Sequence, residues 1–115
     1  KIINTEGCGN CGGAGAGVAL KVTGRTVKVW NLSTMETYAQ AVNVSTGNVV
    51  LQGAAFHHSL AIIGGGTVSF NGVLFRDSGT DVTINGGTVN LWGNIGGGGF
   101  NWTGTPASAS NNIPR

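Results

Sequence analysis

Two four-residue segments carry side chains suited to acid–base chemistry: Phe56-His57-His58-Ser59 and Phe75-Arg76-Asp77-Ser78. Each begins seven residues after a valine of a repeated pattern, so the two segments should occupy equivalent places in successive repeats. His58 would then lie beside Asp77. A carboxylate next to an imidazole stabilises its protonated form and fixes its orientation, as general acid or base catalysis requires. His58 and Asp77 are therefore the catalytic candidates, and the alternative is a solvated turn that the pair only steadies.

A second candidate site is a binding surface. It is made by the fourth residue of a repeated five-residue pattern (a pentad) that begins at Val27, Val49, Val68 and Val89. These residues are Trp30, Gln52, Asn71 and Trp92. In extended strands the fourth position faces away from the first and third, so all four should point outward in one column. A flat ring stacks on the apolar face of a sugar, and amides bind hydroxyl groups. The column predicts a polysaccharide-binding face; the alternative is that a loop or a neighbouring subunit covers each tryptophan.

Cys8 and Cys11 form a Cys-Gly-Asn-Cys pair near the start of the chain. This spacing suits a redox motif, half a zinc site or a small disulfide loop. Zinc would require two further ligands, and a thioredoxin-like site would require a strand-to-helix context. We expect a structural disulfide between Cys8 and Cys11, and we assign no metal and no cofactor because the few acidic residues form no cluster of oxygen ligands.

Composition narrows the classes of protein. The chain has 115 residues, 22 glycines, 9% charged residues, 40% hydrophobic residues and a formal net charge of +2. Collagen is excluded because glycine has no three-residue period, and the apolar content argues against disorder. The Lys and Arg residues are too scattered for a nucleic-acid surface, and no run approaches the roughly 18 to 20 apolar residues of a membrane span. Because the chain starts with Lys1, we expect a processed or excised piece.

An internal repeat of about 20 residues organises the middle of the chain. One series of five-residue segments with the pattern apolar-x-apolar-x-turn begins at Val27, Val49, Val68 and Val89. A second series precedes it in phase and begins at Leu20, Val42, Leu60 and Val82. Two strand series that keep one period indicate stacked coils.

The repeat predicts an all-β fold, a right-handed parallel β-helix of about four rungs that is part of a longer stack. The repeat is too short for a strand–helix–strand unit, and it fits one coil of three short strands joined by glycine-containing turns. The first and third residues of each pentad should point inward: Val27, Val29, Val49, Leu51, Val68, Phe70, Val89 and Leu91. A β-sandwich or jelly roll is the alternative, but its hairpins would not need two phased series. A left-handed β-helix would favour strict hexapeptide spacing.

The repeat divides the chain into a Gly-rich segment at 1–19, β-helix rungs at 20–95, and a C-terminal cap and tail at 96–115. Phe100 and Trp102 should fold over the last rung as a cap, because a repeat stack needs its ends covered. The opening segment lacks such a cap. We therefore expect the N-terminal end to stack on another polypeptide segment of the same protein or on identical protomers.

The two best-formed rung segments, residues 68–75 and 82–91, resemble rungs of the pectate-lyase-like right-handed parallel β-helix superfamily, which includes polysaccharide lyases, glycoside hydrolases and tailspike-like proteins. The resemblance concerns the rung pattern and carries no catalytic motif. It implies the C-terminal portion of a secreted, extracellular carbohydrate-active protein that acts on a polysaccharide, with most catalytic residues on another segment. The alternatives are a structural or adhesive spike without chemistry in this chain, and a self-contained binding module.

Overall fold

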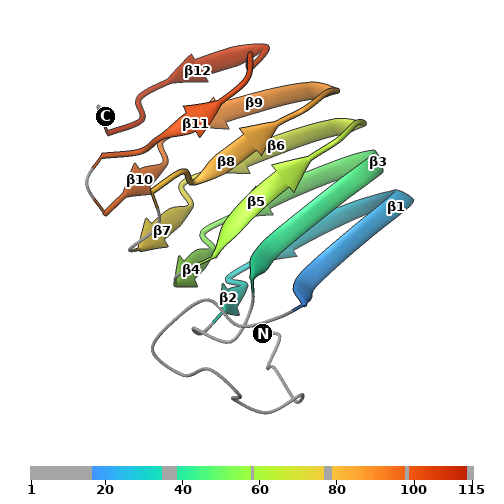
Figure 1. Cartoon of the computed structure of the whole chain (residues 1–115), viewed down its shortest axis with the longest axis horizontal. Helices are drawn as coiled ribbons and strands as arrows, with labels where there is room; N and C mark the ends of the chain where they lie inside the picture. Colours follow the sequence, from blue (N-terminus) through green and yellow to red (C-terminus); the bar gives the residue numbers. More distant parts are fainter. Residues whose placement is uncertain (1–16, 35–38, 58, 77–78, 98, 114–115) are drawn as a thin grey trace.

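The structure is a computed structural model, and it describes residues 17–34, 39–57, 59–76, 79–97 and 99–113. The described residues are all-β, and the strands pair in parallel to form a β-solenoid of about four turns. Figure 1 shows the coils stacked from β1 at one end to β12 at the other. The described residues contain no helix that is long and apolar enough to cross a membrane.

Among the described residues each coil except the last contributes strands to three faces. The strands are β1 (Val18–Trp30), β2 (Ser33–Thr34), β3 (Gln40–Gln52), β4 (Ala55–His57), β5 (Leu60–Ile63), β6 (Thr67–Asn71), β7 (Leu74–Arg76), β8 (Val82–Ile84), β9 (Thr88–Trp92), β10 (Ile95–Gly96), β11 (Trp102–Thr103) and β12 (Ser108–Ser110). The first face holds the N-terminal halves of β1 and β3, then β5, β8 and β11. The second holds the C-terminal halves of β1 and β3, then β6, β9 and β12. The third holds β2, β4, β7 and β10.

The first two coils differ from the later ones at the corner between the first and second faces. There β1 and β3 each run through the corner as one strand of 13 residues, whereas later coils divide into separate strands. Gly24 and Gly47 have φ angles of +86° and +119° at this corner, and the pairing shifts register beside them. Glycine permits this bend because it has no Cβ to clash in the left-handed region.

The interior is a set of apolar columns that run along the solenoid axis. Val49, Val68 and Val89 pair in register with each other, and all three are fully buried. Side chains alternate between inside and outside along a strand, so one inward residue in each coil builds a continuous core. The inward positions predicted for the second face are confirmed in the second to fourth coils; Val27 and Val29 of the first coil are only partly buried.

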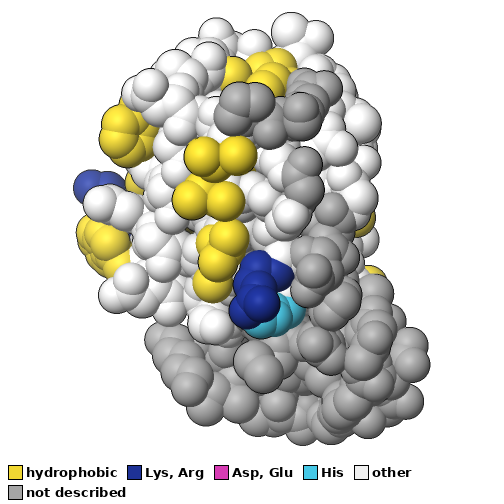
Figure 2. Space-filling view, turned by 90° about the vertical axis from the view of Figure 1, so that its left-hand side faces the viewer, with side chains coloured by type: hydrophobic (Ala, Val, Ile, Leu, Met, Phe, Trp, Pro, Cys, Tyr) yellow, Lys and Arg dark blue, Asp and Glu magenta, His cyan; other side chains and the backbone are white. Residues whose placement is uncertain are grey.

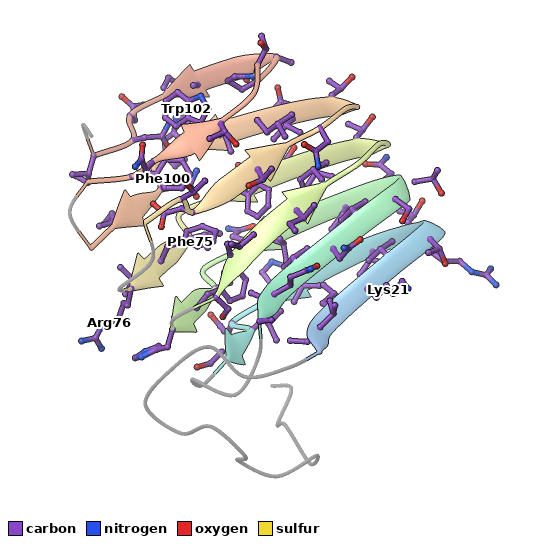
Figure 3. All side chains as sticks on the ribbon, in the orientation of Figure 1. Lys21, Phe75, Arg76, Phe100 and Trp102 are labelled. Carbon is purple, nitrogen blue, oxygen red and sulfur yellow. The ribbon has the colours of Figure 1, made fainter. Side chains whose placement is uncertain are left out.

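Aromatic rings fill the interior behind the third face. Phe75 lies 5.2 Å from Phe56, 6.2 Å from Phe70 and 5.7 Å from Phe100, measured between ring centroids. All four side chains have no exposed surface. Figure 3 shows Phe75 and Phe100 pointing into the space between the sheets. These contacts join three consecutive coils.

A left-handed residue marks the corner after the second face in every coil. The five residues and their φ angles are Asn31 (57°), Gly53 (63°), Gly72 (61°), Gly93 (66°) and Asn111 (56°). Glycine and asparagine tolerate this conformation best. The repeated corner turns the chain from the second face into the third.

Asn94 is a buried polar residue just after this corner. Its amide nitrogen donates to the Phe70 carbonyl at 3.0 Å, and its Oδ1 accepts from the Val73 N–H at 2.9 Å. It also donates to Oδ1 of Asn112 in the next coil at 3.0 Å. These bonds satisfy the hydrogen-bonding groups of a fully buried amide and link the turns of successive coils.

One predicted register is wrong by a single residue. The sequence pattern aligned Leu60 with Val42 and Val82, but the structure pairs Ala61 with both. Ala61 and Ile63 are therefore fully buried, whereas Leu60 is half-buried. A register shift in the pairing of β3 with β5 accounts for the difference, and a one-residue slip exchanges the two faces of a strand.

The parallel ladders continue past residue 95, where the sequence pattern ends the rungs. Trp102 pairs with Val82 in the first face, and Ser108 pairs with Asn90 in the second. Phe100 and Trp102 contact each other at 5.7 Å over the last apolar rung. Phe100 immediately precedes a further coil and Trp102 belongs to it, so the described residues after 96 extend the stack.

Candidate functional site

The structure brings the four predicted binding residues into one column on the second face. Trp30 pairs with Gln52, Gln52 with Asn71, and Asn71 with Trp92. We call these four residues the tryptophan–amide column. The two rings stand three coils apart, roughly 14 Å at about 4.8 Å per coil.

Both rings of the tryptophan–amide column are open to solvent. Trp30 is 59% exposed and Trp92 is 54% exposed, the two largest values among the exposed hydrophobic side chains of the described residues. No loop of the described residues covers either ring. A large apolar side chain exposed to this degree marks a contact surface more often than a structural one.

A second column of side chains, polar except for Val50, lies beside the first on the same face. Its members occupy the alternate outward position of each strand: Lys28, Val50, Ser69, Asn90 and Ser108. The Ser108 hydroxyl donates to Oδ1 of Asn90 at 2.7 Å, so this bond links the last two coils across the surface. The second face therefore combines two exposed rings with amides and hydroxyls, and Lys28 supplies its positive charge.

The first two residues of the two segments proposed for acid–base chemistry occupy equivalent places in adjacent coils. Phe56 pairs with Phe75, and His57 pairs with Arg76 on the third face. Figure 3 shows Arg76 pointing away from the solenoid. His58 and Asp77, the catalytic candidates themselves, lie outside the described residues.

Ser59, which follows these histidines, has a structural contact. Its side chain is 1% exposed, and its hydroxyl donates to the His57 carbonyl at 2.9 Å. This bond stabilises the turn between the third face and β5. Ser59 is therefore placed to hold the turn rather than to contact a ligand.

Asp81 is a buried acid with a similar positioning role. It is 1% exposed, and its Oδ2 accepts from the Asn101 N–H at 2.9 Å. Its own backbone N–H donates to the Asn101 carbonyl, also at 2.9 Å. The side chain thus fixes the segment that leads into β11.

The third face carries an apolar stripe that the sequence analysis did not identify. It consists of Ala55, Leu74, Ile95 and Ile113, each of which donates its N–H to a carbonyl of the preceding coil at the same corner. Ile95 is 46% exposed and Ile113 is 45% exposed. Figure 2, which faces this side of the molecule, shows a hydrophobic stripe next to Arg and His side chains. The stripe could have been predicted from the residue two places after each of the last four left-handed corners, because that residue is apolar in all four.

The remaining predicted sites fall beyond what the structure describes. Cys8 and Cys11 lie outside the described residues, and no disulfide is found among the described ones. No group of three His, Cys, Asp or Glu side chains in the described ranges lies close enough together to hold a metal ion.

Comparison of the chain with family models, with curated proteins and with solved structures finds no match. The fold and the surface residues therefore carry the functional argument alone.

Proposed function

We propose that this chain is the polysaccharide-binding part of a secreted carbohydrate-active β-helix protein, which would belong with the pectate-lyase-like superfamily. The observation that carries the proposal is the tryptophan–amide column, in which two exposed rings flank two amides in strict register. An extended glycan laid along the solenoid axis could stack on both rings and bond to the amides between them. Hydrolysis or lyase chemistry would reside mostly on residues of another segment.

The spacing of the column favours a polymer over a small sugar. Trp30 and Trp92 are too far apart for one monosaccharide to touch both, at roughly 14 Å for three coil spacings. Each contact alone is weak because the surface is open and half of a stacked ring stays solvated. Affinity should therefore come from several sugar units bound at once.

Changing either tryptophan to alanine should weaken polysaccharide binding about tenfold, and changing both about a hundredfold, since a stacking contact with its buried area is worth roughly 1.4 kcal/mol. Affinity electrophoresis in gels that contain neutral or acidic linear polysaccharides identifies the ligand and measures the dissociation constant. Ile113→Ala is the matched control, because Ile113 is comparably exposed on a different face. Equal retardation of wild type and the Trp30→Ala/Trp92→Ala variant would remove the column from the site.

A structural or adhesive role is the second candidate, and the apolar stripe favours it. Ile95 and Ile113 expose almost half of their surface on the third face. Packing of this face against a neighbouring subunit would bury the stripe. Light scattering distinguishes the two functions. A stable oligomer that dissociates in the Ile95→Asp variant supports a structural spike. Glycan binding by a monomer supports the first proposal.

A further inference from the structure

The outer edge of β1 leaves the apolar interior partly open. Among the described residues β1 pairs only with β3, so no described strand pairs with its other edge. The inward residues Leu20, Val27 and Val29 are partly buried. Their partners in β3 are fully buried: Val42, Val49 and Leu51. A further strand against β1 would complete this end of the core.

Positive charge is concentrated on the same strand. Four Lys or Arg residues lie within the described ranges, and three of them are exposed side chains of β1: Lys21, Arg25 and Lys28. The fourth, Arg76, lies on the third face. The one acid in the described ranges, Asp81, is buried. Figure 3 shows Lys21 on the end coil. Cations on an edge strand oppose its pairing with a strand of like charge.

The residue pattern of β1 shows which partner this charge disfavours. Two copies related by a two-fold axis would pair β1 with β1 in antiparallel fashion about the corner at Gly24–Arg25. That register places Leu20 opposite Val29 and Val22 opposite Val27. All four residues face inward, so they would extend the apolar core across the junction. The register also sets Lys21 opposite Lys28 twice, and like charges directly opposite each other are destabilising. The apolar pattern of β1 is therefore compatible with pairing to a second copy, but repulsion between the lysines disfavours that pairing.

We propose that the β1 edge is a docking site for a strand of a partner protein that carries acidic side chains opposite Lys21 and Lys28. Backbone hydrogen bonds and the inward apolar residues supply the affinity, and the cations select the partner. Opposite charges in these cross-strand positions favour the complex and like charges exclude a second copy. Lys28 also borders the tryptophan–amide column, but the test measures association between protein chains and so does not depend on glycan binding.

A charge-reversed copy of the same chain tests the proposal directly. The probe is the Lys21→Glu/Arg25→Glu/Lys28→Glu variant, which should not associate with itself but should pair with the wild-type chain. Light scattering should show a mass in the equimolar mixture above that of either chain alone, approaching two chains of 11.6 kDa. The complex should weaken in high salt, because exposed ion pairs are screened. Arg76→Glu is the control, and its mixture with wild type should show no increase.

A neutral variant provides a second test that remains valid if the charge-reversed chain does not fold. Lys21→Gln/Arg25→Gln/Lys28→Gln removes the repulsion, so this chain should self-associate where wild type does not. The proposal is overturned if wild type self-associates and the glutamate substitutions abolish that association, because the edge then accepts a second copy. It is equally overturned if folded glutamate and glutamine variants show no increase in mass.

Discussion

Replacing Phe75 with alanine should lower the free energy of unfolding by about 4 kcal/mol. Its ring has no exposed surface and contacts three other phenylalanine rings within 6.2 Å. The substitution removes contacts to three coils at once, and the rigid β-sheets around the ring cannot collapse to fill the cavity. Urea unfolding followed by circular dichroism measures the change.

Leu74→Ala is the matched control for Phe75→Ala. Leu74 precedes Phe75 in β7 but faces outward and is half-buried. Its truncation should cost about 1 kcal/mol, since only part of its surface leaves water on folding. Equal losses for the two variants would contradict the assignment of Phe75 to the shared core.

Replacing Gly66 with alanine should destabilise the chain by about 4 kcal/mol, the sum of a left-handed backbone penalty and overpacking against fixed backbone. Gly66 has a φ angle of +82°, and a Cβ built there meets the Gly47 carbonyl oxygen at 2.5 Å. That oxygen belongs to the preceding coil, so the coils would have to separate. Thermal unfolding of the variant measures the loss.

Gly72→Ala isolates the clash from the backbone penalty. Gly72 has a comparable φ angle of +61°, but a Cβ there meets nothing within 4 Å. Its substitution should cost about 1 kcal/mol through backbone strain alone. If Gly66→Ala is no worse than Gly72→Ala, the close stacking of glycine corners is not a determinant of the fold.

The sequence was sufficient to predict the stacked strands and the tryptophan–amide column, because both follow from a period. Alternation within each pentad defines the inward and outward sides, and the spacing of the pentads defines the register. The phase of Leu60 could not be predicted in the same way. Leu60, Ala61, Ile62 and Ile63 are all apolar, so alternation is lost there, and only the pairing shows that Ala61 faces inward.

The last coil was not predicted because β12 has no buried apolar residue and alanine is its one apolar residue. Ser108–Ser110 is exposed throughout, so no inward pattern distinguishes it from a polar tail. A signal does exist at the corner, where Asn111-Asn112-Ile113 repeats the conformation of Gly93-Asn94-Ile95. The docking edge of β1 could not be predicted from the sequence either. The spacing of Lys21, Arg25 and Lys28 shows no pattern, and only the strand pairing shows that all three lie on the end strand of the described stack.

The central claim is that an extended glycan lies along the tryptophan–amide column. The most direct test is a calorimetric titration of the wild-type chain with oligosaccharides of increasing length. These oligosaccharides are derived from the polysaccharide that binds best. Affinity should rise with length until the oligosaccharide spans Trp30 to Trp92, roughly 14 Å at about 4.8 Å per coil, and then level off. In the Trp92→Ala variant the rise should stop at shorter lengths. Affinity that is independent of length, or that rises equally in wild type and variant, would contradict the claim.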